Sequence, residues 1–143
     1  MDVQEVRKLD GYLRKLFQNA RIRVVPKKAD AAEVFIGEER LGALIVDDED
    51  DERSYNFEIK ITLGEAANIK NLKMLEAYLR RKFDNEQIRV VARARKTDSA
   101  EVCVGQEYIG VLFFDEKETT SCFFEMPILA LDLEDVRPGG GSA

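Results

Sequence analysis

The sequence predicts an α+β fold in which two tandem α-β-β-β-β modules associate as a pseudo-two-fold dimer within one chain. The first observation is an internal repeat: residues 9–17 return in similar form as residues 75–83, and residues 22–25 return as residues 88–91. In each copy, apolar residues first recur every three or four positions and then every second position, which indicates a helix followed by strands. Each module is therefore expected to be an antiparallel four-stranded meander with one helix packed on it.

The repeat also sets the predicted domain boundaries. The first module covers residues 1–63, a linker covers 64–68, and the second module covers 69–136. The glycine-rich residues 137–143 are expected to form a flexible tail, either native or a cloning remnant. A module of about 65 residues has a marginal core on its own, so packing of the two copies against each other would add stability.

One amphipathic helix is expected at the start of each copy. In copy one the apolar stripe covers about residues 3–18, with Asp2 as the N-cap and Asn19 at the end. In copy two the stripe follows Asn68, which is the expected N-cap, and Asn85 stands where Asn19 stood.

The strands are expected to follow each helix directly. Polar and apolar residues alternate over residues 21–25 in copy one and 87–91 in copy two. The next loop spans residues 26–30 in copy one and residues 93–98 in copy two, which has two extra residues there. Pro127 lies in the last strand, so that strand is expected at a sheet edge or with a bulge.

The third strand of each copy is apolar on both sides. In copy one, Leu41, Ala43 and Ile45 alternate with residues that are also apolar, and residues 109–114 repeat the pattern in copy two. Such a strand is expected to be buried on both faces. The module's helix covers one face, and the other copy is the economical cover for the second. Which sheet faces or edges meet is left open.

The composition excludes several classes of enzyme. The chain has 143 residues, a net charge of −6 and no histidine, so it lacks the commonest general base and metal ligand. It also contains no phosphate-binding loop, nucleophile elbow or zinc-site spacing. We therefore expect a non-enzymatic protein without a cofactor or metal. Cys103 and Cys122 are expected to be buried apolar residues, with a disulfide or redox pair as the alternative.

The lengths of the apolar segments indicate the expected cellular compartment. The first residues form no apolar signal-peptide core, and no apolar run reaches the length of about 18 residues that a membrane helix needs. A cytoplasmic protein without a membrane partner is therefore expected.

Charged residues supply the candidate binding site. Basic residues concentrate in the first half of each copy, and a basic strand face beside a basic loop is typical of a groove that follows phosphates. The candidate ligand- or partner-binding residues are Arg23, Arg89, Arg93, Arg95 and Lys96. The competing interpretation is charge complementarity with the acidic second half of each copy. The acidic residues 47–52 are interpreted as a solvated hairpin tip, with a cation site as the alternative.

The chain also resembles a known family. Copy two carries the resemblance in residues 75–83, 96–102, 109–113 and 124–133, and copy one carries it in residues 12–15, 32–34 and 54–57. These segments are similar to domain of unknown function 3126, a family of small, mostly single-copy alphaproteobacterial proteins. The resemblance implies a small cytoplasmic bacterial protein and supplies no active site. This chain departs from the family as a tandem fusion, and its copy one replaces the final strand extension with the linker.

These observations together favour a protein-interaction or scaffold module whose unknown protein partner binds a sheet edge or an exposed sheet face. The alternatives are a nucleic-acid-binding protein that uses the basic first-strand faces and a small acidic chaperone or adaptor. The expected state is a monomeric pseudodimer or a higher homo-oligomer.

Overall fold

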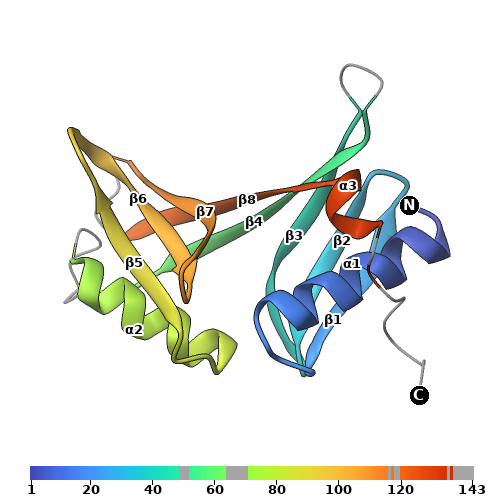
Figure 1. The fold of residues 1–143 in the computed structure, drawn as a ribbon, viewed down its shortest axis with the longest axis horizontal. Coiled ribbons are helices and arrows are strands. Elements are labelled where there is room, and N and C mark those ends of the chain that lie inside the picture. Colours follow the sequence, from blue (N-terminus) through green and yellow to red (C-terminus); the bar gives the residue numbers. More distant parts are fainter. Residues whose placement is uncertain (49–51, 64–70, 116, 118–119, 135, 137–143) are drawn as a thin grey trace. The chain divides into compact units, whose positions relative to one another are not determined.

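The computed structural model describes residues 1–48, 52–63, 71–115, 117, 120–134 and 136 (Figure 1). Its elements within these residues are α1 (Val3–Leu16), β1 (Ile22–Lys28), β2 (Ala31–Ile36), β3 (Glu39–Asp47), β4 (Ser54–Thr62), α2 (Leu72–Phe83), β5 (Ile88–Arg93), β6 (Lys96–Val104), β7 (Glu107–Phe114), β8 (Ser121–Leu129) and α3 (Ala130–Leu133). The predicted α+β class and the helix-then-strands order of both modules are confirmed.

The described strands follow the order β1-β2-β3-β4-β8-β7-β6-β5, so β1 and β5 are the edge strands. Consecutive strands within each module pair in the antiparallel direction, as the meander prediction required. The β2–β3 and β6–β7 registers match, bulge included: one bulge separates Val34 from Phe35 on β2, and the equivalent bulge separates Val102 from Cys103 on β6.

The chain divides into two compact units whose limits differ from those of the sequence repeat. Unit 1 contains Met1–Glu58 and Pro127–Ala143, and unit 2 contains Ile59–Met126. The division falls inside β4 and β8, so each of these strands begins in one unit and ends in the other. Each module therefore contributes the end of its last strand to the unit built mainly from the other module.

Unit 1 is built around the apolar face of α1. Asp2 is the N-cap, as predicted, and it forms a capping box with Glu5. The helix ends at Leu16 with Phe17 as its C-cap, two residues before the predicted end. Leu9 and Leu13 are fully buried, and the Phe17 ring meets Phe57 of β4 edge-on with centroids 6.3 Å apart.

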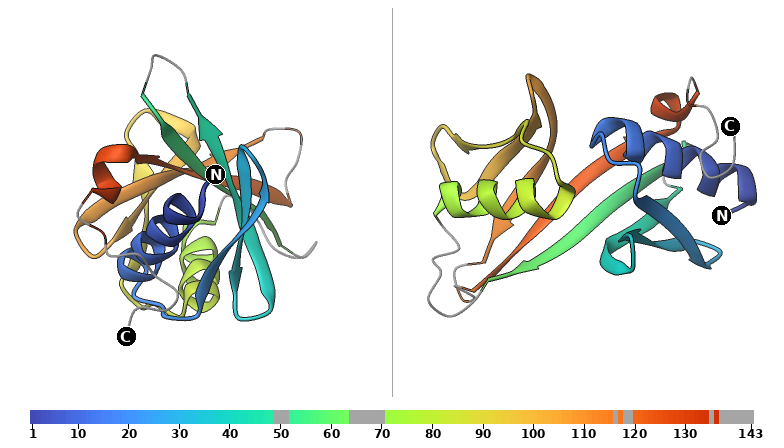
Figure 2. Two further views of the ribbon diagram at one scale, coloured as in Figure 1. Left: turned by 90° about the vertical axis from the view of Figure 1, so that its right-hand side faces the viewer. Right: turned by 90° about the horizontal axis from the view of Figure 1, so that it is seen from below.

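Unit 2 repeats this arrangement around α2 (Figure 2). The prediction of Asn68 as N-cap is wrong: the helix begins at Leu72, and Asn71 caps it by accepting from the amides of Lys73 and Met74. Asn68 itself lies outside the described residues. The expected terminal asparagines act beyond the helices instead, where Asn19 and Asn85 each accept a hydrogen bond from a backbone amide two residues later.

A pair of charged side chains on each helix protects the adjacent edge strand. In unit 1, Asp10 accepts from the Val24 amide at 2.9 Å, and Arg14 donates to the Ile22 carbonyl at 2.7 Å. Asp10 and Arg14 also form an ion pair at 3.1 Å. These bonds occupy backbone groups of an edge strand that would otherwise be available to another strand.

Unit 2 has the same protection with one conservative change. Glu76 accepts from the Val90 amide at 3.0 Å, Arg80 donates to the Ile88 carbonyl at 2.8 Å, and the two side chains pair at 3.2 Å. The repeated acidic residue and the arginine four positions later are thus structural in both copies.

Two strand predictions need correction. The predicted loops 26–30 and 93–98 are mostly strand, because β1 extends to Lys28 and β6 already begins at Lys96. The edge position predicted from Pro127 is also wrong, since β8 lies between β4 and β7. Pairing of β8 with β7 stops at Glu125, so the missing amide proton of Pro127 costs no hydrogen bond to β7.

The third strand is not buried on both faces as predicted. Leu44 of β3 and Leu112 of β7 are fully buried towards the helices, but Ile45 remains 38% exposed and Phe113 remains 41% exposed. The second apolar face is therefore partly open to solvent in both units. Exposed apolar side chains of this kind form a patch on the sheet surface.

Several predictions concern residues outside the described ones. They are the linker 64–68, the tail 137–143 and residues 49–51 of the acidic segment 47–52. Residues 130–133, which end the last segment of copy two that carries the family resemblance, form the one-turn helix α3, where Asp132 accepts from the Leu129 amide. Among the described residues, no helix is long and apolar enough to cross a bilayer.

Candidate functional site

The open face of unit 2, defined here as the side of its sheet away from α2, combines aromatic and acidic side chains. Strand register arranges these residues in two adjacent rows. One row runs Ser99–Phe113–Phe123 across β6, β7 and β8, and the other runs Val91–Glu101–Val111–Glu125 across β5 to β8. Side chains two residues apart on one strand share a face, so the two rows lie next to each other.

Phe113 and Phe123 form the most prominent apolar feature of this face. They are direct cross-strand partners, and they are 41% and 42% exposed. The Lys60 ammonium lies 5.9 Å from the centre of the Phe123 ring, within the range of a cation–π contact. Large aromatic side chains are usually buried, so a solvent-exposed cross-strand pair forms an apolar patch on this face.

Glu101 and Glu125 lie on either side of Val111 in the second row. Both are half-buried, and neither takes part in the ion pairs found among the described residues. Neighbouring strands are about 4.8 Å apart, which places the two backbone positions about 10 Å from each other. The smaller side chain of Val111 therefore forms the floor of a strip with a carboxylate on each side.

The equivalent face of unit 1 is built differently. Ile45 and Asn56 stand in the register positions of Phe113 and Phe123. Glu33, the counterpart of Glu101, binds Lys27 at 2.9 Å and Arg40 at 3.6 Å.

Salt bridges also set the charge state of this unit 1 carboxylate. The hydrogen bond from Lys27 lowers the pKa of Glu33, and Arg40 adds to the effect. Tyr108 replaces Arg40 in unit 2, where it is exposed. The two copies thus differ on the exposed face. In unit 1, Glu33 is paired with two cations, and in unit 2, Glu101 has no ion-pair partner among the described residues.

The basic residues singled out by the sequence serve partly structural roles. Arg23 lies on β1 of unit 1, where it donates to the Gly37 carbonyl and its guanidinium carbon lies 5.1 Å from the Phe35 ring centre. Arg89 on β5 of unit 2 makes the equivalent bond to the Gly105 carbonyl at 2.8 Å. Both arginines close the hairpin beside the first strand.

The other three candidates lie at the β5–β6 turn of unit 2. Arg93 donates to the Ser99 hydroxyl at 3.0 Å. Arg95 adopts a positive φ of 66° in the turn, so the basic strand face does not continue to it. Lys96 is the exposed first residue of β6. The turn is basic, but its arginines do not form the regular row that the sequence suggested.

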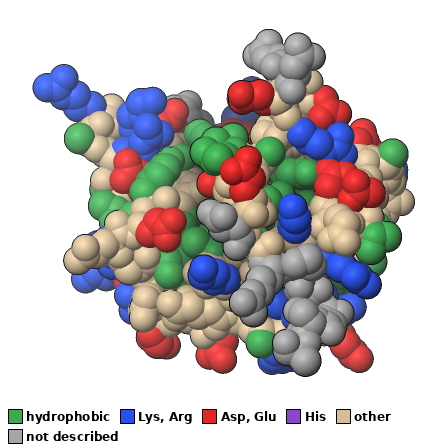
Figure 3. Space-filling model, turned by 45° about the vertical axis from the view of Figure 1, so that its right-hand side comes forward, with side chains coloured by type: hydrophobic (Ala, Val, Ile, Leu, Met, Phe, Trp, Pro, Cys, Tyr) green, Lys and Arg blue, Asp and Glu red, His purple; other side chains and the backbone are tan. Residues whose placement is uncertain are grey.

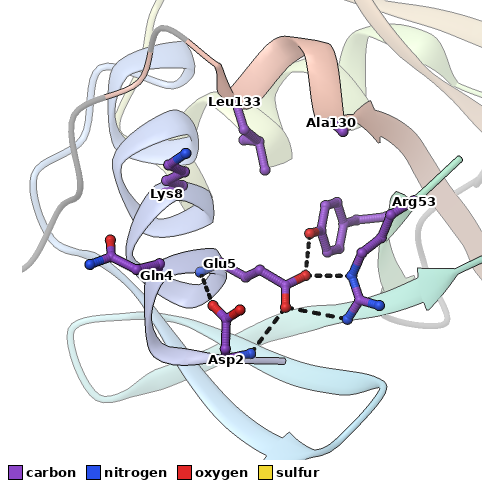
Figure 4. Close-up of a pocket in the computed structure, with 8 residues that line it drawn as sticks. Asp2, Gln4, Glu5, Lys8, Arg53, Ala130 and Leu133 are labelled. Carbon is purple, nitrogen blue, oxygen red and sulfur yellow. Dashed lines mark hydrogen bonds and ion pairs between the residues drawn. The ribbon is translucent and has the colours of Figure 1, made fainter.

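A pocket of about 530 Å³ lies in unit 1 between the first turn of α1, the start of β4 and α3 (Figure 4). Glu5 is the centre of its polar network. The Glu5 carboxylate accepts from Tyr55 and from Arg53 at 2.5 Å each, and it also accepts from the Asp2 amide at 3.0 Å. Arg53 reaches the second Glu5 oxygen at 3.3 Å and Asp48 at 3.2 Å.

This network holds fixed protonation states. Partial burial raises the pKa of Glu5, but the bonds from Tyr55, Asp2 and Arg53 outweigh it and bring the pKa below 4.5. Burial, together with the bond to Glu5, raises the pKa of Tyr55 to about 12. A tyrosine that stays protonated and a carboxylate whose lone pairs are engaged are suited to fastening α1 to β4 and unsuited to acid–base catalysis at neutral pH.

The two cysteines are free and buried. Burial raises the pKa of Cys122 to about 12, so its thiolate is scarce at neutral pH. Within the described ranges no group of three or more acidic or cysteine side chains is placed to hold a metal ion. Residues 49–51 of the acidic segment 47–52 lie outside those ranges.

The view in Figure 3 shows how charge is distributed over one side of the molecule. Basic, acidic and hydrophobic side chains interleave there, without a continuous basic field. Mixed charges around exposed apolar side chains are common at protein-binding surfaces, whereas nucleic-acid sites concentrate positive charge.

The comparison with family models matches the two modules separately. The family described as "Protein of unknown function (DUF3126)" matches residues 5–63 and again residues 71–132. The chain belongs to this family. The two matches confirm that this DUF3126 protein is a tandem duplication. No curated protein and no solved structure has significant similarity to it.

The aromatic pair of this DUF3126 protein was missed because Phe113 was assigned to a buried face. A comparison of the copies contains the signal that would have found it: the polar Asn56 occupies the position of Phe123 and marks that position as solvent-facing. No sequence pattern indicates the Glu5–Arg53–Tyr55 network, because Glu5 lies 48 positions from Arg53 and 50 positions from Tyr55.

Proposed function

We propose that this protein is a non-enzymatic interaction module that binds a protein partner through the open face of unit 2. The observation that carries the proposal is the exposed cross-strand pair Phe113–Phe123. Exposed aromatic residues within a charged surround are typical of the few side chains that supply most of the binding energy at an interface.

The sheet edges support this choice of the face. In both edge strands, backbone groups that a partner strand would use are already bonded to helix side chains, at Ile22 and Val24 in unit 1 and at Ile88 and Val90 in unit 2. Addition of a partner strand would have to displace these charged side chains. Binding through the face needs no such displacement.

The same aromatic pair also gives the nucleic-acid alternative a specific basis, because exposed rings can stack on bases. Lys60 lies at one end of the aromatic row and Arg93 bonds Ser99 at the other. Against it, the adjacent row carries Glu101 and Glu125, and the net charge of the chain is −6. Both features repel a phosphate backbone.

The test compares full-length protein with the double variant Phe113→Ile/Phe123→Asn, which installs the residues of unit 1 at the same register positions. Because the sister sheet already accommodates them, the variant is expected to fold. We expect cross-linking affinity capture from the native lysate to lose its specific partner with this variant. Ile45→Asn on the open face of unit 1 is the matched control and should retain the partner.

Two results would refute the proposal. One is equal recovery of the same partners by wild type and the double variant. The other is capture that nuclease treatment abolishes, together with salt-sensitive binding of labelled single-stranded RNA or DNA that the phenylalanine substitutions remove. The second result would establish the nucleic-acid alternative.

A further inference from the structure

We infer that the partner surface bound by unit 2 presents a cationic side chain, an arginine or lysine, that lies over Val111 between Glu101 and Glu125. This inference rests on the proposed function, because it specifies the chemistry of the partner that the same face would take. It follows from the strand register, the exposure of the face and a comparison of the two copies.

The first step is the geometry of the strip. Glu101, Val111 and Glu125 occupy paired positions on three adjacent strands. A cation above Val111 would therefore meet one carboxylate on each side. Two carboxylates about 10 Å apart at their backbone positions suit the planar fork of a guanidinium, which donates hydrogen bonds in several directions.

The second step is the adjacent aromatic row. Phe113 follows Val111 by two residues on β7, so its ring lies on the same face next to the strip. Aromatic rings attract cations, and the face of Phe123 already has Lys60 at 5.9 Å. The exposed Phe113 ring offers a second surface of this kind, on which the aliphatic stem of an incoming arginine or lysine would also pack.

The third step is the contrast with unit 1, where the same chemistry is already satisfied within the chain. There Lys27 and Arg40 form ion pairs with Glu33. In unit 2, Tyr108 replaces Arg40, and Arg93 bonds Ser99. Unit 1 thus shows that this acidic position accepts cations on the sheet face, whereas in unit 2 neither Tyr108 nor Arg93 forms an ion pair with Glu101.

The cations near the strip remain engaged elsewhere. Arg89 donates to Gly105, Arg93 donates to Ser99, and Lys60 lies over Phe123. They flank the strip without pairing with its two glutamates among the described ion pairs. The net charge of −6 would further favour encounter with a basic segment.

The experiment measures binding of short labelled peptides to the full-length protein by fluorescence anisotropy. The probe is an acetylated peptide of alternating arginine and leucine, compared with peptides of equal length that contain glutamine or glutamate in place of arginine. We expect the arginine peptide to bind at least tenfold more tightly than the glutamine peptide, and the glutamate peptide not to bind.

Three variants locate the effect. Glu101→Gln/Glu125→Gln should weaken the arginine peptide at least tenfold, and Tyr108→Arg should also weaken it by supplying the cation that unit 1 has. Glu33→Gln/Glu58→Gln removes the same two charges from the equivalent positions of unit 1 and should leave binding within about twofold.

The outcomes separate this inference from the proposed function. Loss of binding in Phe113→Ile/Phe123→Asn with no change in Glu101→Gln/Glu125→Gln would overturn the cationic partner and leave the face as the binding surface. The cationic partner is likewise overturned if the glutamine peptide binds as tightly as the arginine peptide, or if none of the peptides binds. Arginine-specific binding that no substitution on the unit 2 face alters would overturn both.

Discussion

Single residues decide which surfaces of this protein are available. In unit 1 the charged groups are closed into local networks, with Glu5 bound by Arg53 and Tyr55, and Glu33 bound by Lys27 and Arg40. These carboxylates bind other residues of the same unit and so stabilise the fold. On the equivalent surface of unit 2, Glu101 and Glu125 take part in none of the ion pairs among the described residues, and we propose that a partner's cation pairs with them.

Glu5→Gln tests the network at the pocket. Hydrogen bonds to a charged group contribute about 1.5–3 kcal/mol, so the variant should lose roughly 1–3 kcal/mol of unfolding free energy at pH 7. The pKa of Glu5 is lowered in the folded protein, below 4.5, so this stabilisation is complete above about pH 4.5 and declines as the pH falls through the folded value.

Urea denaturation of wild type and Glu5→Gln across pH 3–7 measures this difference. It should be largest at neutral pH and should shrink in acid. Glu38→Gln, an exposed turn residue, is the control and should change stability by less than about 0.5 kcal/mol. A difference between wild type and Glu5→Gln that grows as the solution is acidified would show that the carboxylate network is not stabilising.

Gly110→Ala tests the packing behind the open face. A Cβ atom at Gly110 would lie 2.5 Å from the Glu125 carbonyl oxygen and 2.9 Å from the Phe124 ring. The backbone atom cannot rotate away, so strands β7 and β8 would have to separate. We expect a loss of about 1–3 kcal/mol by chemical denaturation, against less than about 0.5 kcal/mol for Gln106→Ala in the nearby turn. An unchanged denaturation midpoint in Gly110→Ala would contradict the close strand approach.

At the level of elements, the helices fasten the strands beside them. Each helix places an acid and an arginine four residues apart, and these reach the amide and carbonyl groups of the adjacent edge strand. The bonds keep the strand in place and also prevent strand addition at that edge. Each helix therefore limits how the adjacent edge strand can pair with another strand.

Arg80→Ala tests this role against the adjacent Arg81→Ala. Arg80 donates to the Ile88 carbonyl and pairs with Glu76, whereas Arg81 makes a cation–π contact with Tyr78 at 5.9 Å. We expect Arg80→Ala to cost about 1–2 kcal/mol and to promote self-association, detected by light scattering. Arg81→Ala should cost about 0.5 kcal/mol or less. Equal effects of the two substitutions would refute the edge-protecting role.

The sequence predicted the elements well, because helix and strand periods are local properties. The Asp2 cap and the α1 stripe are examples. It failed where a residue's environment depends on strand order: Pro127 suggested an edge, yet β8 is an inner strand, and Ile45 looked buried, yet it faces solvent. For the basic candidates, the hydrogen bonds to Gly37, Gly105 and Ser99 depend on hairpin geometry that the sequence pattern does not reveal.

At the scale of the whole molecule, the boundaries of the sequence repeats differ from the boundaries of the two compact units. The repeat ends its first copy near residue 63, while unit 2 begins at Ile59. The buried side chains of Ile59 and Ile61 thus belong to unit 2, although the first copy encodes them. A fragment cut at the repeat boundary loses part of a core that a fragment cut at the unit boundary keeps.

This gives a prediction for two fragments of the second half. The fragment 59–126 contains all of unit 2, whereas the fragment 69–136 lacks Ile59 and Ile61. Burying two isoleucines contributes about 3–6 kcal/mol, which exceeds the margin of so small a domain. We expect dispersed amide NMR signals from 59–126 and slower hydrogen exchange than in 69–136. Equal order in both fragments, or order in 69–136 alone, would contradict the unit boundaries.

The crossing of β4 and β8 from one unit to the other has a consequence for assembly. A chain with one copy of this module would lack the strand end that the other copy supplies. We expect such a chain to complete its core by exchanging strand ends with a second chain, in a bimolecular step that dilution weakens. Joining two copies makes that step intramolecular, so the strand exchange no longer depends on protein concentration. Because the exchanging copies no longer have to be identical, the sequence of each copy can change separately. The two copies differ in this way at one equivalent position: Glu33 pairs with Lys27, whereas Glu101 takes part in no ion pair among the described residues.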